Sequence, residues 1–215
     1  MKTSFKILGS CRIDENKIFV NQQLVFDNFA INFSQFADTA YQNQGVDYPR
    51  FYKMNNLSKL GFLAAEYLLS NFVESPSAHV SGELTGIILA NHYSSLDTDL
   101  KHQQFIKQGV ASPAVFVYTL PNILIGELCI RQGIKGENTF FIAADYDIPG
   151  QTAYVTQLLN DQLITHCFVG WVEYTAAGHQ AFLAFVGPSA EAALPDYTST
   201  TINLLFHQSY GRAES

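Results

Sequence analysis

Apolar residues recur along this chain at two spacings, and each spacing predicts one kind of element. Between Leu57 and Leu68 they return every three or four residues, which is the period of an amphipathic helix. A second helix is predicted from Pro121, because proline is tolerated at the first helical position, to a stop at Gly133. A third is predicted over about 149–163. The inward face of the second helix should carry Ile123, Leu124, Leu128 and Ile130.

Runs that are apolar almost throughout predict strands that are covered on both faces. Two such runs are Leu84 to Ala90 and Asn138 to Ala144, and we expect them to be adjacent or nearly adjacent in one sheet, covered by the helices that contain Leu63 and Leu128. A shorter β-rich run, Phe5 to Leu8, predicts a first core strand.

Two further β-rich runs, Cys167 to Tyr174 and Gln180 to Val186, are separated by a short segment with Gly178. This spacing predicts a hairpin with a loop of three to five residues. Residues 17–54 are polar and aromatic without steady periodicity, so they are interpreted as irregular or partly helical covering structure.

The predicted order is strand, helix, strand, helix, strand, helix and then two strands. Such alternation predicts an α/β fold, with a mostly parallel mixed sheet that has an antiparallel edge and helices on its faces. No repeat, low-complexity segment or linker divides the sequence, so residues 1–215 are expected to form a single domain.

Composition and charge exclude several classes of partner. The chain is 47% hydrophobic and has a formal net charge of -7 without a basic stripe, so a nucleic acid is not expected to bind. The apolar element near the N-terminus is too short for a secretory signal or a membrane span. We therefore expect a cytoplasmic protein that does not enter a membrane.

The three cysteines, Cys11, Cys129 and Cys167, are odd in number and far apart. This spacing argues against a disulfide framework and against a zinc site, and Cys129 and Cys167 are best explained as buried thiols. Neither a metal ion nor another cofactor is expected.

Three stretches, taken in order, resemble the N-terminal half of β-ketoacyl synthases. They are NLSKLGFLAAEYLL (56–69), ASPAVFVYTLPNILIGELCIRQGIKGENTFF (111–141) and HCFVGWVEY (166–174). The middle stretch is the most specific, because it combines Ser112-Pro113, Asn122 and the Gly133–Gly136 turn in the family's order. The resemblance implies one half of the thiolase-like αβαβα sandwich, that is, a single β-ketoacyl synthase N-terminal-like domain.

The family's nucleophile, however, is missing from this sequence. In active members a cysteine follows the turn glycine by nine positions, and counting from Gly136 leads to Asp145, which is preceded by Ala143 and Ala144. A thiolate is needed to take the acyl group as a thioester, whereas a carboxylate would give a reactive anhydride. The resemblance further implies that Asn122, Ala144 and Asp145 lie at the substrate position.

The catalytic histidines of the family belong to a C-terminal half that this chain is not expected to contain. None of its six histidines corresponds to them. Because these histidines polarise the malonyl thioester, their loss adds to the loss of the nucleophile. The first hypothesis is therefore a non-catalytic subunit, similar to the chain length factors that assist ketosynthases in fatty acid, polyketide or aryl-polyene pigment synthesis.

Two other functions stay open. Asp145 could act as general acid or base in a hydrolase-like reaction on thioesters, which would require a histidine within hydrogen-bond reach. The chain could also be a homodimeric module that binds acyl groups or carrier proteins. A structural alternative is that Asp145 or Asp147 caps the following helix, and that His92, after the preceding strand, is an ordinary surface residue.

The partner expected from the resemblance is a ketosynthase subunit, together with an acyl carrier protein. In ketosynthases the strand that leads to the nucleophile pairs across the dimer axis. Here that strand contains Phe140, Phe141 and Ile142 and has no charge to protect an exposed edge. We therefore expect these three residues at the interface of a homodimer or of a heterodimer with a ketosynthase.

Overall fold

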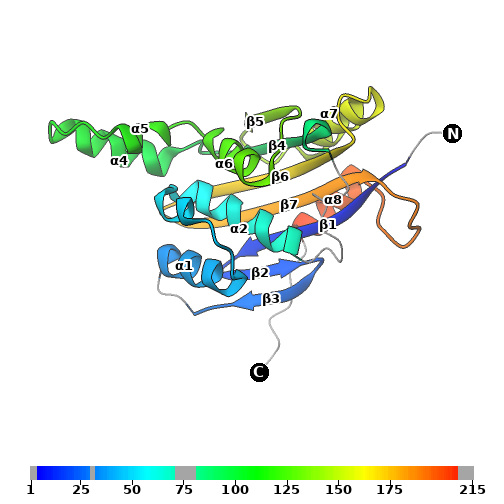
Figure 1. Ribbon diagram of the computed structural model, residues 1–215, viewed down its shortest axis with the longest axis horizontal. Helices are drawn as coiled ribbons and strands as arrows, with labels where there is room; N and C mark the ends of the chain where they lie inside the picture. Colours follow the sequence, from blue (N-terminus) through cyan, green and yellow to red (C-terminus); the bar gives the residue numbers. More distant parts are fainter. Residues whose placement is uncertain (1–3, 30–31, 71–80, 208–215) are drawn as a thin grey trace.

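The computed structural model describes residues 4–29, 32–70 and 81–207, in which one sheet lies between two layers of helices (Figure 1). The strands are β1 (Phe5–Asp14), β2 (Lys17–Val20), β3 (Gln23–Asp27), β4 (Thr85–Asn91), β5 (Asn138–Ile142), β6 (His166–Thr175) and β7 (Gly178–Pro188). The helices are α1 (Phe33–Gln44), α2 (Asn56–Ser70), α4 (Leu96–Lys107), α5 (Pro113–Val117), α6 (Ile123–Gln132), α7 (Ile148–Asn160) and α8 (Ser199–His207), with short 3-10 helices at Pro49–Lys53 and Gly82–Leu84.

The seven strands form one mixed sheet in the order β3-β2-β1-β7-β6-β4-β5. β4 pairs in parallel with both β5 and β6, whereas the other neighbouring pairs are antiparallel. Five strands run in one direction, and only β2 and β7 run against them. The expected mixed α/β sheet is confirmed, and its antiparallel part is larger than a single edge.

Each face of the sheet has its own hydrophobic core. The alternation along β4 shows the division, because Ile87 and Leu89 pack toward α1, α2 and α6, while Ile88 and Ala90 pack toward α7 and α8. Every residue of β4 is buried. The expected cover on both faces of this strand is thus confirmed, and the helices that contain Leu63 and Leu128 supply only one of the two layers.

The adjacency of the two apolar runs is confirmed, since Leu89 of β4 pairs with Phe140 of β5. Cover of β5 on both faces was wrongly predicted: Phe141 is 40% exposed and Ile142 52% exposed. The reason is position, because β5 is the last strand of the sheet and has a neighbour on one side only. Ile130 of α6 is also exposed instead of inward-facing.

The N-terminal region is more regular than its sequence suggested. Residues 17–27 form β2 and β3 rather than irregular cover, and the hydrogen-bonded ladder of β1 extends to Asp14. The predicted hairpin is β6–β7, but Thr175 pairs with Gly178, so its loop has two residues, Ala176 and Ala177. No helix among the described residues has the length and apolarity needed to cross a membrane.

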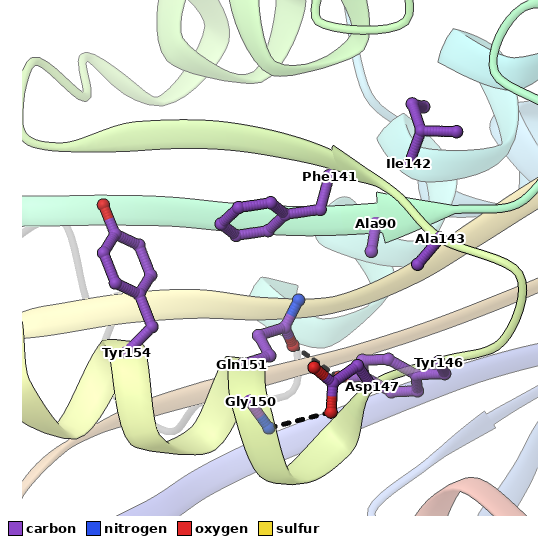
Figure 2. A pocket seen from close by; sticks show the side chains of 9 residues that line it. All are labelled: Ala90, Phe141, Ile142, Ala143, Tyr146, Asp147, Gly150, Gln151 and Tyr154. Atoms are coloured by element: carbon purple, nitrogen blue, oxygen red, sulfur yellow. Dashed lines mark hydrogen bonds between the residues drawn. The ribbon is translucent and has the colours of Figure 1, made fainter.

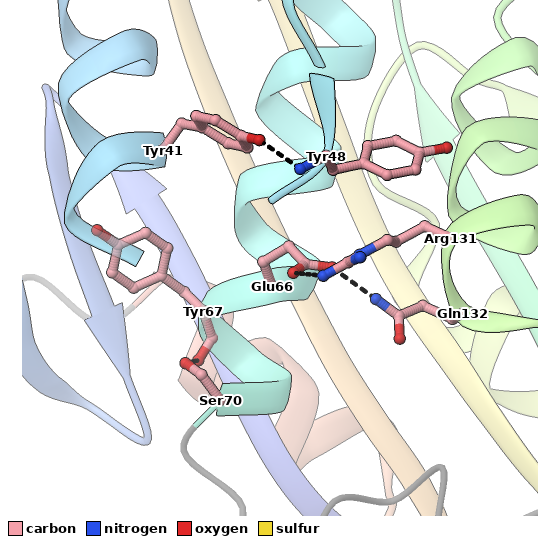
Figure 3. A network of polar contacts seen from close by, with 7 residues as sticks. All are labelled: Tyr41, Tyr48, Glu66, Tyr67, Ser70, Arg131 and Gln132. Atoms are coloured by element: carbon pink, nitrogen blue, oxygen red, sulfur yellow. Dashed lines mark hydrogen bonds and ion pairs between the residues drawn. The ribbon is translucent and has the colours of Figure 1, made fainter. Parts of the chain in front are cut away.

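A buried ion pair joins α2 to α6 on the larger core face (Figure 3). Glu66 is 7% exposed and accepts two hydrogen bonds from Arg131, from Nε and from Nη2, each at 2.9 Å. Gln132 donates a third at 2.6 Å, and the Arg131 guanidinium lies over the ring of Tyr48. Hydrogen bonding to Glu66 raises the pKa of Arg131. The Arg131 guanidinium therefore stays charged at neutral pH.

Candidate functional site

The carboxyl ends of β4, β5 and β6 meet at one end of the sheet, because these three strands are parallel. This is the end at which open α/β sheets usually place their functional groups. The turn after β4 covers 92–95, the loop between β5 and α7 covers 143–147, and Glu173 lies near the end of β6. These segments form the candidate site.

Hydrogen bonds connect the three segments. Oε2 of Glu173 accepts from the backbone N–H groups of His92 at 2.7 Å and Tyr93 at 3.2 Å. Nδ1 of His92 lies 2.6 Å from the carbonyl oxygen of Ala144. Glu173 thus fixes the turn after β4, and His92 connects that turn to the residue beside Asp145.

The other oxygen of Glu173 has no such role. Oε1 is buried and has no hydrogen-bond partner among the described residues. A buried carboxylate oxygen without a donor is costly, so the two backbone bonds to Oε2 must hold the side chain in place.

Replacement of Glu173 by alanine should therefore loosen the turn after β4. Two hydrogen bonds to a charged acceptor are lost, so we expect a decrease of about 2 kcal/mol in the free energy of unfolding. Hydrogen exchange of the His92 and Tyr93 amides should become at least about tenfold faster. The matched control is Glu191→Ala in the exposed loop after β7, which should change neither quantity, and unchanged exchange in Glu173→Ala would contradict the assigned role.

Asp145 lies in the bend between β5 and α7 and is exposed. Its side chain makes no hydrogen bond or ion pair within the described parts of the chain. The cap of α7 is Asp147, whose Oδ1 accepts from the N–H of Gly150 at 3.0 Å. The helix-cap alternative therefore applies to Asp147 and leaves Asp145 without a structural role at this helix.

Asn122 precedes α6, and its side chain makes no capping hydrogen bond. Ala144 and Asp145 are exposed in the β5–α7 loop. No hydrogen bond in the described residues joins Asn122 to either of them. The substrate-binding role of these three residues stays a prediction.

A pocket of about 300 Å³ opens beside this loop, between β5 and α7 (Figure 2). It is lined by Ala90, Phe141, Ile142, Ala143, Tyr146, Asp147, Gly150, Gln151 and Tyr154. The rings of Phe141 and Tyr154 meet edge to face, 5.8 Å between centroids. Most of the lining is apolar, so the pocket suits an alkyl or aromatic group.

The inner wall of the pocket is held by one buried amide. Gln151 accepts a hydrogen bond from the Tyr146 hydroxyl at 2.6 Å and donates to the carbonyl oxygen of Gly170 at 3.2 Å. Burial raises the pKa of Tyr146 well above its ordinary value, so this hydroxyl stays a donor. Asp145 does not line the pocket.

Sequence reasoning missed this pocket and the hydrogen bonds of Glu173. Three residues that line the pocket, Gly150, Gln151 and Tyr154, lie within about one turn of α7. This spacing could have indicated that they share one face of the helix. Nothing in the sequence could show that Glu173 reaches two amides some eighty residues away. Among the described residues, no group of three His, Cys, Asp or Glu is arranged to hold a metal ion.

Solved structures with a similar fold include ketosynthases and chain length factors. The ishigamide ketosynthase/chain length factor superposes on 90% of this chain with a TM-score of 0.63 at 18% identity. The chain has the ketosynthase fold. A complex of a type II polyketide acyl carrier protein with its ketosynthase, AntDE:AntF, covers 87% of the chain with a TM-score of 0.59 at 13% identity.

A third structure with the ketosynthase fold is the ketosynthase ApeO in complex with its chain length factor ApeC from Xenorhabdus doucetiae. It covers 88% of this chain with a TM-score of 0.56 at 12% identity. The chain spans 64% and 63% of the first two structures, less than two thirds of each, and 81% of the third. Neither a family model nor a curated protein matches the sequence, so the likeness is one of fold.

Proposed function

We propose that this chain is a non-catalytic ketosynthase-like subunit, similar in role to a chain length factor, which assists β-ketoacyl synthesis in a fatty acid, polyketide or aryl-polyene pathway. The observation that carries the proposal is Asp145. It follows the strand and turn that lead to the nucleophile in the resembling family, on a chain with the ketosynthase fold. Its side chain is exposed and makes no bond with the described residues.

The chemistry of Asp145 argues against condensation at this position. Exchange with a carrier thioester requires a polarizable nucleophile whose acyl adduct is itself a thioester, and a carboxylate cannot provide one. General acid or base chemistry would be supported by a histidine in hydrogen-bond reach of Asp145. The histidine of the site, His92, contacts the Ala144 carbonyl oxygen instead. The hydrolase alternative thus lacks the contact that would favour it.

The proposed interface with a ketosynthase is the free edge of β5. The strand sequence NTFFI has no charge, no proline and no bulge in its pairing with β4, which are the features that usually protect an edge. Phe141 and Ile142 expose apolar surface at this edge. An acyl carrier protein is the proposed source of the acyl thioester on which the pair acts.

The purified chain is expected to form no condensation product from acyl and malonyl carrier-protein thioesters, and Asp145→Asn should behave like the wild type. Added to a candidate ketosynthase partner, the wild-type chain should co-purify with that enzyme and alter product yield or length. Phe141→Lys should abolish both effects, because a lysine at the edge opposes strand pairing.

The matched control for Phe141→Lys is Leu204→Lys, which places the same charge on an exposed apolar site of α8, away from β5. Condensation that depends on Asp145 would contradict the proposal. Thioester hydrolysis lost in Asp145→Asn would instead support the hydrolase function. A chain that binds a carrier protein yet never a ketosynthase would support the binding module.

A further inference from the structure

A second pocket lies where helices α4 and α5 leave the body of the molecule. This pair of helices, here called the arm, extends away from the sheet in Figure 1. The pocket has a volume of about 300 Å³ and shares no lining residue with the pocket beside β5. Its lining includes Lys53, Asn55 and Asn56 from the body and Asp97, Thr98 and Lys101 from the arm.

Hydrogen bonds between the body and the arm form this pocket before any ligand binds. Nδ2 of Asn55 donates to Oγ1 of Thr98 at 2.8 Å and to the carbonyl oxygen of Tyr118 at 3.3 Å. Nδ2 of Asn56 donates to Oδ2 of Asp97 at 3.2 Å. Thr98 is only 4% exposed, so the pocket has a buried polar side chain in its wall. A pocket that is already formed lowers the entropic cost of ligand binding.

Two ammonium groups of this pocket have no anionic partner. Lys53 is the last residue of the 3-10 helix Pro49–Lys53, Lys101 lies in the middle of α4, and both side chains are exposed. Neither forms an ion pair or a hydrogen bond within the described parts of the chain. Helix α2 also begins at the pocket and has no acidic residue in its first turn, so the positive end of its dipole adds to the two charges. The pocket therefore favours an anion.

One carboxylate also lines the pocket and restricts the choice of anion. Oδ2 of Asp97 accepts from Asn56, whereas Oδ1 has no hydrogen-bond donor among the described residues. Asp99 does not line the pocket, and its carboxylate accepts from Oγ of Ser95 at 3.3 Å. The lining thus carries two positive charges and one negative charge. A ligand that fits places an anionic group at the lysines and a hydrogen-bond donor at Asp97.

A small phosphate monoester with a hydroxyl group meets both requirements. Its phosphate has a charge of about −1.5 to −2 at pH 7 and three acceptor oxygens, so it can accept hydrogen bonds from two lysines at once. A carboxylate has a single charge and two oxygens. The hydroxyl group of the ester supplies the donor for Asp97. The volume of about 300 Å³ is at the lower end of small-molecule sites, so the ligand is small.

We propose that the pocket at the base of the arm binds a small hydroxylated phosphate monoester, whose phosphate contacts Lys53 and Lys101 and whose hydroxyl donates to Asp97. Lys53 belongs to the body and Lys101 to the arm, so the bound phosphate joins the two parts. The ligand should therefore reduce local opening of the arm. This site does not depend on the proposed subunit role, because it includes neither Asp145 nor the edge of β5.

The test is isothermal titration calorimetry of the purified full chain with glycerol 3-phosphate as the probe, at low ionic strength. Sulfate, which lacks the hydroxyl group, should bind at least about tenfold more weakly, and glycerol, which lacks the phosphate, should not bind. Lys53→Gln and Lys101→Gln should each weaken binding of the probe by about tenfold, because each removes one hydrogen bond to a charged group. Asp97→Asn should bring the affinities for the probe and for sulfate to within about threefold of each other, because the amide can also donate.

The matched control is Lys107→Gln, which removes an exposed lysine of the same helix outside the pocket and should leave the dissociation constant unchanged. Saturating probe should also slow hydrogen exchange of the α4 amides at least about threefold in the wild type and not in Lys101→Gln. A wild-type chain that binds no probe, or that binds it as tightly after either substitution in the pocket, overturns the site. Equal affinity for sulfate overturns the role of Asp97, and binding without slower exchange overturns the link between ligand and arm.

Discussion

Replacement of Gly170 by alanine is expected to prevent stable folding. Gly170 lies in the middle of the sheet, where β6 pairs with β4 on one side and with β7 on the other. A Cβ atom at this position would lie 1.9 Å from the carbonyl oxygen of Phe182 and 2.9 Å from the Leu183 side chain. The carbonyl belongs to a paired strand and cannot move without breaking the sheet. We expect a loss of at least about 4 kcal/mol, a large part of the stability of an ordinary domain.

The matched control is Gly126→Ala in α6, where a Cβ atom would meet nothing within 4 Å. Alanine is favoured over glycine in helices, so this variant should gain about 0.5–1 kcal/mol. Urea unfolding followed by circular dichroism measures both variants. A Gly170→Ala chain that unfolds at the wild-type midpoint would show that the β6–β7 contact is looser than described.

Replacement of Arg131 by methionine should be nearly as damaging, for an electrostatic reason. It removes both hydrogen bonds from the guanidinium to Glu66 and leaves that carboxylate 7% exposed, with only Gln132 as a donor. Loss of one partner of a buried pair costs about 3–5 kcal/mol, because an uncompensated charge stays in the interior. Thermal or urea unfolding at pH 7 measures the change.

Two variants separate this explanation from a loss of packing. Glu66→Leu combined with Arg131→Met removes both charges and should recover most of the stability, since apolar replacements of a buried pair are often neutral. Lys135→Met breaks the exposed pair with Glu83 and should cost less than about 1 kcal/mol. A double variant as unstable as Arg131→Met would contradict the charge argument.

The apolar pattern predicted the centre of the fold well and its margins poorly. β4 was predictable because all seven of its residues are buried, and α2 because its apolar period is regular. β3 was not, since four of its five residues are exposed and its pairing with β2 is what defines it as a strand. Helices α4 and α5 were missed for a related reason: most of their apolar residues do not face a core, so the spacing of those residues does not follow one.

In the candidate site, too, positions along the chain could be predicted from the sequence, whereas contacts between distant residues could not. The resemblance in the sequence placed Asp145 after an apolar strand, and the structure has it in the loop after β5. Which aspartate caps α7 required geometry, because both Asp145 and Asp147 precede the helix. The contact of Glu173 with the turn after β4 joins residues that the sequence alone cannot pair.

The position of β1 has a consequence for the synthesis of the chain. β1 is the first described strand and pairs with the last, β7, since Ile7 pairs with Val186. β2 and β3 attach to the sheet through β1. At a translation rate of about 5–20 residues per second, β1 waits on the order of ten seconds or more for β7. During that time one edge of β1 lacks its partner, and the thiol of Cys11, which the finished core buries, is accessible. Nascent chains are therefore most open to strand mispairing and to oxidation before β7 leaves the ribosome.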